Sequence, residues 1–316
     1  MNQAPTTELS TVTTWLHQTL GEHSVVGTAA QNARREGTGQ LVVEVVDAAG
    51  ERWFAKQVAD QQCWRFEVRA YRRWVPALGD LAPTLKAVDR DSRLLLLGAV
   101  PGVSPSAADR AAHRQAGALL RRLHEVKPGR EQRPGDQRNA NGPLHALLKD
   151  VPGLLSEEQE QFARHHLRQL ESLPPTSMVP CHGDYNTHNW LVDASGTLRV
   201  VDFGNARWQI PALEFARLYF GPWWYRPNLA EAFFEGYGRR PDDRELEFVR
   251  HRVVVRAVQT IAFGLRRSSQ RHLDVGRSRL DELMAGHDAT RREPLRGRVR
   301  QRVRDRVPGP TRTRRT

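Results

Sequence analysis

Two short stretches of the sequence decide the fold: CHGDYNTHNWLV at residues 181–192 and VVDFG at residues 200–204. The first places Asp184 five residues before Asn189 and then continues into a short apolar run. The second is an apolar run that ends in Asp202, thirteen residues after Asn189. A polar Asp-Ala-Ser-Gly turn separates the two runs. This order predicts a loop, a strand, a turn and a strand, which would bring the three side chains to one end of a β-hairpin.

The three side chains that such a hairpin gathers all carry oxygen atoms. Hard Mg²⁺ ions prefer oxygen ligands, and the phosphate groups of ATP complete their coordination shells. Phosphoryl transfer by kinases needs an acid near the accepting hydroxyl, together with an Asn and an Asp on the metal ions. A single loop Asp is more often a turn or cap residue, so the prediction depends on all three residues at this spacing. The sequence therefore predicts a site for ATP and Mg²⁺.

Taken in order, these motifs resemble the aminoglycoside phosphotransferase and choline kinase-like family, which is related to protein kinases. The resemblance is carried by His-Gly-Asp…Asn at 182–189 and by Asp-Phe-Gly at 202–204. It implies that Asp184 is the catalytic residue, which accepts or orients the proton of the substrate hydroxyl. It also implies that Asn189 and Asp202 hold the magnesium across the phosphates.

The resemblance covers roughly residues 25–238 and implies a nucleotide site ahead of these loops. Lys56 ends a strand where a kinase keeps the lysine that binds the α- and β-phosphates. Glu67, in the following helix, is its expected ion-pair partner. The Leu-rich run that ends in Ala-Val-Pro-Gly resembles a hinge whose backbone amides hold adenine, with Leu97 and Ala99 as the expected contacts.

Two features leave the details of the site open. No Gly-x-Gly-x-x-Gly precedes residue 41, so either residues 29–32 or residues 34–39 would cover the phosphates. Thr187, His188 and the Gln-Ile-Pro at 209–211 depart from the residues that are usual in the family. These departures leave the metal-binding residues intact but blur the substrate subclass.

The resemblance implies a bilobal, protein-kinase-like fold of the α+β class, and the patterning agrees. Residues 1–98 are predicted to form a small N-lobe, with helices over 9–20 and 61–75 and an antiparallel β-sheet. Its strands are expected at 24–30, 41–47, 51–58, 84–88 and 93–97. Residues 99–290 are predicted to form a larger, mainly helical C-lobe, with helices capped by Ser106 and Ser156 and further helices over most of 212–283.

The formal charge of +12 lies mostly in the last residues. Residues 291–316 hold eleven arginines and two acids, a net charge of +9, so the preceding chain carries only +3. Such a tail, with almost no large apolar side chains, predicts disorder. It also lacks the interleaved aromatics on which bases stack, so we expect no nucleic-acid partner.

Composition also bears on the compartment. No apolar run approaches the roughly 18 residues of a transmembrane helix, and the polar N-terminus has no secretory pattern. The two cysteines, Cys63 and Cys181, are far apart and lack metal-ligand spacing. These features favour a cytoplasmic protein that does not bind membranes. We separately expect a monomer.

Several other residues near the motifs have structural interpretations. His182 is expected to be a buried histidine that hydrogen-bonds one of the two loops, and Cys181 a small apolar residue. The aromatic residues within 219–237 are interpreted as core between helices, and the acids within 242–247 as the solvated start of a helix. The residues that contact the acceptor are therefore left unassigned.

Three functions are compared on these residues: a small-molecule O-phosphotransferase, a protein serine/threonine kinase, and a non-catalytic nucleotide- or RNA-binding protein that uses its basic tail. Only eight residues separate Gly204 from the helix expected near Leu213, which leaves no room for a peptide-docking activation segment. The loop at 182–184 also reads His-Gly-Asp, whereas protein kinases have His-Arg-Asp, so the arginine that would pair with an activating phosphate is missing. Asp184, Asn189 and Asp202 are all present, which argues against a protein that has lost catalytic activity. We therefore predict ATP- and Mg²⁺-dependent phosphorylation of a small-molecule hydroxyl, on an aminoglycoside-like antibiotic or a related metabolite.

Overall fold

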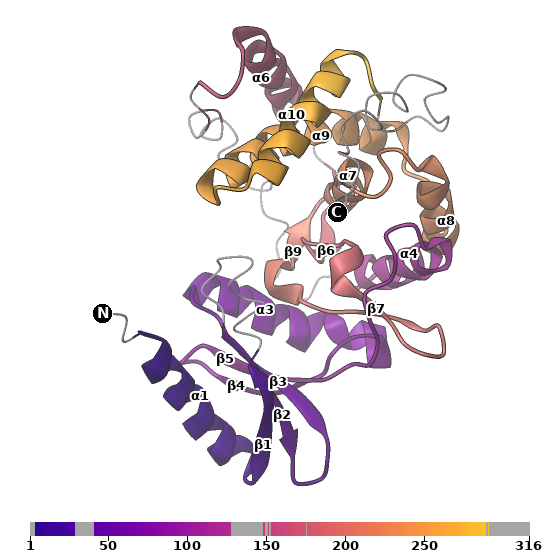
Figure 1. Ribbon diagram of the computed structural model, residues 1–316. Helices are drawn as coiled ribbons and strands as arrows, with labels where there is room; N and C mark the ends of the chain where they lie inside the picture. The colour runs from indigo at the N-terminus through magenta and orange to yellow at the C-terminus, as the bar shows by residue number, and fades with distance from the viewer. Residues whose placement is uncertain are drawn as a thin grey trace, which may run out of the picture.

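The computed structural model describes residues 4–28, 41–127, 153–174 and 176–288, together with Leu148, Val151 and Thr290. The described chain forms a lobe built on a β-sheet and a larger lobe that is mostly helical (Figure 1). The predicted bilobal α+β architecture is confirmed. The division of the chain at residues 98 and 290 stays a prediction. Three expectations lie outside the described residues: the covering loop at 29–32 or 34–39, the tail at 291–316, and residues 128–142, whose Arg-, Asn-, Gly- and Pro-rich composition predicts an exposed loop.

The N-terminal lobe contains an antiparallel sheet of five strands in the order β1-β2-β3-β5-β4. The strands are β1 (His23–Thr28), β2 (Leu41–Asp47), β3 (Arg52–Gln57), β4 (Leu85–Asp89) and β5 (Leu94–Gly98). β5 pairs with β3 and β4 on its two sides, and its leucines are buried in a separate core cluster on each face of the sheet. An apolar run without alternation is typical of such a central strand.

The two helices of this lobe cover opposite faces of the sheet (Figure 1). Alternate side chains of β5 divide between them: Leu94 and Leu96 pack with α1 (Ala4–Leu20), whereas Leu95 and Leu97 join the core that includes α3 (Gln61–Arg73). Helix α1 begins five residues before its predicted start, because its first turn is polar and carries no hydrophobic periodicity. The short 3₁₀ helix η1 (Val75–Leu81) follows α3.

The larger lobe consists mainly of helices, as predicted. They are α4 (Arg110–His124), α6 (Glu157–Ser172), α7 (Ala212–Phe220), α8 (Pro227–Tyr237), α9 (Asp243–Arg266) and α10 (Gln270–Met284). Ser156 forms the predicted capping box of α6. The predicted cap of α4 is wrong: Asp109 accepts the Ala112 N–H at 2.9 Å, while the Ser106 hydroxyl is used in the preceding turn. Asp109 lies nearer the helix, where its carboxylate reaches the free N–H groups.

Most of the aromatic residues within 219–237 are buried between helices, as predicted. The interpretation of the acids within 242–247 is only partly right. Asp242 and Glu245 form a capping box at the start of α9, but Glu245 is buried rather than solvated. Its carboxylate is paired with Arg239, at 2.6 Å, which offsets the cost of burial.

Helices α4 and α8 approach each other closely at two glycines. A Cβ at Gly117 would overlap the carbonyl oxygen of Phe233, and a Cβ at Gly236 would overlap that of Arg114. We expect Gly236→Ala to lower the free energy of unfolding by about 2 kcal/mol, because overlap with rigid backbone outweighs the gain of about 1 kcal/mol in helix propensity. Urea denaturation measures this change.

A strand glycine provides the control for this substitution. Among the described residues, a Cβ at Gly27 would meet nothing nearer than Glu44 Oε2 at 4.0 Å, so Gly27→Ala should change stability by less than about 0.5 kcal/mol. A more stable Gly236→Ala protein would show that the two helices do not pack as closely as described.

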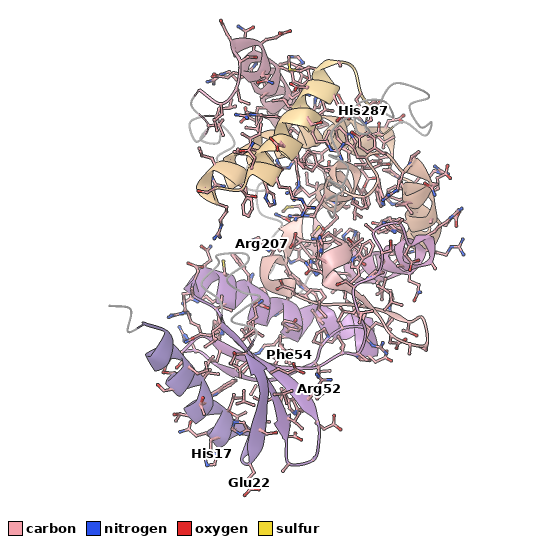
Figure 2. The ribbon with its side chains drawn as sticks, in the orientation of Figure 1. His17, Glu22, Arg52, Phe54, Arg207 and His287 are labelled. Atoms are coloured by element: carbon pink, nitrogen blue, oxygen red, sulfur yellow. The ribbon has the colours of Figure 1, made fainter. Side chains whose placement is uncertain are left out.

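Two small two-stranded sheets and two 3₁₀ turns carry the loops that contain the sequence motifs. β6 (Val179–Cys181) pairs with β9 (Arg207–Gln209), and β7 (Trp190–Val192) pairs with β8 (Leu198–Val200). η3 (Thr187–Asn189) precedes β7, and η4 (Phe203–Asn205) follows β8. Figure 2 shows Arg207 where the lobes meet, and its guanidinium lies over the Phe66 ring of α3, 4.6 Å from the centroid.

Among the described residues, no helix combines the length and apolarity that crossing a bilayer requires.

Candidate active site

The β7–β8 hairpin brings the two sequence motifs together, as predicted. At one end, Asp193 Oδ1 accepts the N–H groups of Ser195 and Thr197 and closes the turn. At the other end, the N–H of Val201 donates to the carbonyl oxygen of Asn189 at 3.0 Å. The loop of residues 182–189 therefore lies directly beside the strand end that leads to Asp202.

His182 fixes the same junction from inside. It is fully buried, and its Nε2 lies 3.0 Å from the carbonyl oxygen of Val201, so this nitrogen carries the proton and donates. Nδ1 then accepts the N–H of Asp184 at 3.2 Å. The prediction of a buried, structural histidine is confirmed. Cys181 is also buried, and burial raises the pKa of its thiol well above the ordinary value, which confirms its interpretation as a small apolar residue.

Asp184 is held by three side chains. Arg217 and Asn186 donate to its Oδ1, and Asn189 Nδ2 donates to its Oδ2 at 3.2 Å and to its carbonyl oxygen at 2.9 Å. Arg217 comes from α7 and also donates to the carbonyl oxygen of Gly183 at 2.8 Å. Sequence reasoning missed Arg217, although a single arginine within the otherwise apolar end of a helix was a signal for it.

The loop is also tied to α7 through its backbone. Gly183 has a left-handed conformation, with φ of 80°, and a Cβ at this position would overlap the carbonyl oxygen of Asn205. Its N–H donates at 2.8 Å to Glu214, a buried residue of α7. Only glycine fits so close to the Asp-Phe-Gly segment with this backbone conformation.

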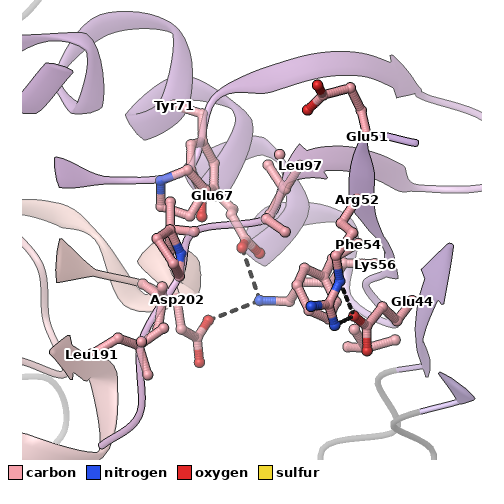
Figure 3. A pocket seen from close by; sticks show the side chains of 18 of the residues that line it. Glu44, Glu51, Arg52, Phe54, Lys56, Glu67, Tyr71, Leu97, Leu191 and Asp202 are labelled. Atoms are coloured by element: carbon pink, nitrogen blue, oxygen red, sulfur yellow. Dashed lines mark hydrogen bonds and ion pairs between the residues drawn. The ribbon is translucent and has the colours of Figure 1, made fainter. Parts of the chain in front are cut away.

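Lys56 connects the sheet to the Asp-Phe-Gly segment (Figure 3). Its ammonium group lies 2.8 Å from Glu67 Oε1 and 2.8 Å from Asp202 Oδ1. Burial lowers the pKa of Lys56, but the two carboxylates outweigh this and hold it above the ordinary value. The charge of Lys56 lowers the pKa of Asp202, whereas burial raises the pKa of Glu67 and Lys56 only partly offsets that effect. The pair of Lys56 and Asp202 crosses from one lobe to the other.

A cavity of about 800 Å³ opens beside this pair. Both lobes line it, with residues that include Phe54, Lys56, Glu67, Tyr71, Leu97, Ala99, Val100, Leu191 and Asp202 (Figure 3). Leu97 and Ala99 both line the cavity, but the N–H of Ala99 donates to the carbonyl oxygen of Arg52 at 2.9 Å. The amide of Ala99 is therefore not free to hold a ligand. Among the described residues, the amide of Val100 has no hydrogen-bond partner.

We expect Lys56→Met to lower the free energy of unfolding by about 3–5 kcal/mol at pH 8, because it leaves the Glu67 carboxylate buried without its cation. Burial then holds the pKa of Glu67 above that of the unfolded chain, so protonation relieves the penalty as the pH falls. The loss should be smaller at pH 5 than at pH 8. Denaturant unfolding at the two pH values measures it.

A double variant and an exposed lysine provide the controls. Lys56→Met with Glu67→Gln should recover part of the stability, since no buried charge remains. Lys86→Met removes an exposed lysine that lies over Trp53, and should cost less than about 1 kcal/mol. Equal losses for the Lys56 and Lys86 variants would show that the buried pair does not form.

Comparisons with known proteins agree with this arrangement. The family model of the phosphotransferase enzyme family (APH) matches residues 31–250, more than half of the chain. Amicoumacin kinase, solved with AMP-PNP, Ca²⁺ and its ligand Ami, has a similar fold: TM-score 0.62 at 14% identity, covering 93% of this chain and 98% of that one. The GDP complex of aminoglycoside 2'-phosphotransferase-IIIa has a TM-score of 0.59 at 16% identity, covering 88% of this chain and 98% of that one.

Two further similarities extend the range of relatives. A choline/ethanolamine kinase family protein from Mesorhizobium loti gives a TM-score of 0.60 at 16% identity, covering 86% of this chain and 90% of that one. Mitogen-activated protein kinase kinase kinase 5 of Arabidopsis thaliana is 32% identical over 95 residues, which span 30% of this chain and 13% of that protein. The likeness to the solved structures shows a kinase-like fold. With the family match over residues 31–250, it shows that the chain belongs to the phosphotransferase enzyme family and is a kinase.

Proposed function

We propose that this kinase transfers the γ-phosphate of ATP to a hydroxyl group of a small molecule. One observation carries the proposal: Lys56 and Asp202 meet at a cavity lined by both lobes, and the loop that holds Asp184 and Asn189 is hydrogen-bonded beside Asp202. A cavity of about 800 Å³ is of the size that small-molecule sites have. Phosphoryl transfer relies mostly on positioning and charge stabilisation, and these residues supply both.

The cavity offers separate places for the two ends of the nucleotide. Phe54, Leu97 and Leu191 provide apolar side chains for the adenine, and the amide of Val100, which has no partner among the described residues, provides a donor for it. The expected amide contact therefore moves from Ala99 to Val100. Lys56 lies at the polar part of the lining, where it would bind the α- and β-phosphates, and Glu67 holds its ammonium group in place.

The donor atoms near Asp202 fit Mg²⁺. Asn189 directs its Nδ2 to Asp184, which leaves Oδ1 as an oxygen donor. Lys56 occupies Oδ1 of Asp202 and keeps the pKa of this carboxyl low, so that Oδ2 is a charged donor. Oxygen-only donors are those that Mg²⁺ prefers. When bound, Mg²⁺ neutralises the charge that develops on the phosphates.

Asp184 is the residue that we propose to accept or orient the proton of the acceptor hydroxyl. The acceptor is proposed to be a small molecule, because only η4 and β9 lie between Asp202 and the start of α7 at Ala212, a span too short for peptide docking. Several relatives bear the names of antibiotics, so we propose an antibiotic or a related metabolite. Cys63 and Cys181 are free thiols, which fits a reaction in the cytoplasm.

The experiment is a melting assay followed by an acceptor screen. We expect ATP to raise the Tm only with Mg²⁺, and we expect ATP to be consumed in the presence of one class in a panel of hydroxyl-bearing antibiotics and metabolites. Asp184→Ala serves as the blank for that consumption. If neither ATP nor GTP raised the Tm with Mg²⁺, the proposed nucleotide site would be wrong.

A further inference from the structure

The outer face of α3 is a row of arginines. Four of them are exposed: Arg65, Arg69, Arg72 and Arg73. At 3.6 residues per turn, they fall within an arc of about 100° around the helix axis. Glu67 is the single acid of this helix, and it is buried and paired with Lys56 on the opposite side. The exposed face therefore carries positive charge without any acid of its own.

This charge is not neutralised by neighbouring elements either. Within the described part of the chain, Arg65, Arg69 and Arg72 form no ion pair. Exposed arginines of α4 differ from them, because Arg110 and Arg114 are both paired with Glu235. Like charges one turn apart on a helix destabilise it slightly, and an external anion would remove this cost.

The row of arginines leads into a second cavity, at the C-terminal end of α3. The cavity has a volume of about 510 Å³ and lies between α3 and η1 on one side and β4 on the other. Arg72 belongs both to the row and to the lining. Among the described residues, Arg72 and Lys86 are the charged members of the lining, and no acid belongs to it. The apolar members are Val75, Pro76, Pro83, Leu85, Ala87 and Val88.

This cavity is separate from the nucleotide cavity. Tyr71 and Pro83 line both cavities and therefore lie between them. Tyr71 is buried, and its ring packs edge-on against Phe203 of the Asp-Phe-Gly segment, with 5.5 Å between the ring centroids. A group bound in the second cavity would therefore contact the outer side of this wall, and the nucleotide cavity would stay open.

The shape of the surface favours a peptide over a membrane or a nucleic acid. Membrane-binding helices insert protruding apolar side chains, but among the described residues no exposed large apolar side chain lies on α3, η1 or β4. Single-stranded nucleic acids stack their bases on aromatic rings, and the exposed residues of α3 include no aromatic ring. The apolar part of this surface is concave, so it suits a side chain that enters it.

Strand addition to β4 is not the mode of binding that the structure favours. β4 is the last strand of the sheet on this side among the described residues. Its register shifts between Leu85 and Ala87, and the residue at the shift is the exposed Lys86. A bulge and a lysine are features that protect an edge strand from pairing with another chain. Recognition here would depend on side chains.

We propose that the α3 arginines and the adjoining cavity bind an acidic peptide segment of a partner protein that carries one large apolar side chain. The apolar side chain enters the cavity, and the acids form charge-assisted hydrogen bonds with Arg65, Arg69 and Arg72. Arg65 and Arg72 are seven residues apart, about 10 Å along the helix. A run of acids spans this distance, whereas a small carboxylate would meet one arginine. This inference goes beyond the proposed function and does not depend on it.

The first test measures fluorescence anisotropy of a labelled octapeptide that has one phenylalanine among acidic residues. Arg65→Glu combined with Arg69→Glu should weaken its binding at least about tenfold. Arg168→Glu combined with Arg244→Glu changes the net charge equally at exposed positions of the larger lobe, and should leave the affinity within about twofold of the parent. The basic tail is the same in all three proteins, so it does not contribute to the differences. Equal weakening by the two double variants would overturn the proposal.

The second test separates the cavity from the charges. A probe with serine in place of phenylalanine should bind the parent at least about tenfold more weakly, since burial of a phenylalanine is worth about 1.5–3 kcal/mol. Pro76→Trp places a large side chain at an exposed position of the lining. It should weaken binding of the phenylalanine probe but not of the serine probe. If the parent bound both probes equally, the arginines alone would account for binding and the proposal would fail.

The third test addresses other ligands of the same surface. Binding of phosphatidylserine vesicles and of a single-stranded RNA oligonucleotide should differ by less than about twofold between the parent and the Arg65→Glu, Arg69→Glu protein. A loss as large as that for the peptide would assign the arginines to a membrane or to nucleic acid, against the proposal. Mg·ATP should not displace the peptide from the parent. Displacement would place the probe in the nucleotide cavity and would also overturn the proposal.

Discussion

Asp184→Asn is expected to lower kcat for phosphotransfer about 10³-fold, because the amide can no longer accept the proton of the acceptor hydroxyl. The shape of the side chain is preserved, and one oxygen remains for the donors that surround it. Affinity for Mg·ATP should stay within about threefold of the parent, since Asp184 is not one of the proposed metal ligands. Steady-state kinetics and a nucleotide titration measure the two effects separately.

Stability decides whether a loss of activity in this variant is informative. The NH2 group of Asp184→Asn replaces one oxygen, so either Asn189, or both Arg217 and Asn186, lose their acceptor, at a cost of about 1 kcal/mol for each lost hydrogen bond. Arg217 keeps its second contact with Gly183, so the loop remains attached to α7. Asp91→Asn, the same exchange at an exposed turn, should leave both kcat and stability unchanged. A variant at Asp184 with more than a third of the parent kcat would show that this carboxylate is not the base.

The residues that could be predicted are those whose placement is decided by local structure. Asp184, Asn189 and Asp202 lie within one loop and one hairpin, so their spacing alone brings them together. Lys56 and Glu67 come from a strand and the helix that follows it, and only the resemblance to kinases indicated that they would meet. The contact of Lys56 with Asp202 joins residues 146 positions apart, a distance at which patterning carries no information.

The residues that sequence reasoning missed come from helices far along the chain. Periodicity identifies α7 and α9 as helices, but it does not say which face is turned toward the 182–189 loop. Arg252 precedes three consecutive valines and is buried with them, whereas Arg244 on the same helix is exposed. Composition alone does not distinguish these two arginines. Tertiary packing of α9 against α7 and the other helices makes the distinction.

Asp202→Asn is expected to reduce kcat/KM for ATP about 10³-fold or more, and to abolish most of the Mg²⁺-dependent rise in Tm that ATP gives the parent. The substitution keeps the size of the side chain but removes the negative charge that Lys56 maintains through its effect on the pKa of this carboxyl. The fold should survive, because Lys56 keeps Glu67 as its partner in the N-terminal lobe. Activity should recover in part when the Mg²⁺ concentration is raised, since the amide oxygen remains a weak ligand.

This recovery distinguishes a metal ligand from a base. Both Asp184→Asn and Asp202→Asn should be nearly inactive at low Mg²⁺, but only the second should lose nucleotide stabilisation and respond to added metal. Asp202→Lys provides an internal control, because a positive charge at this position excludes the metal and should not respond at any concentration. If Mg·ATP stabilised Asp202→Asn as strongly as the parent, the metal would be held by other groups, and the gathering of oxygen donors at the end of the β7–β8 hairpin would have a structural role only.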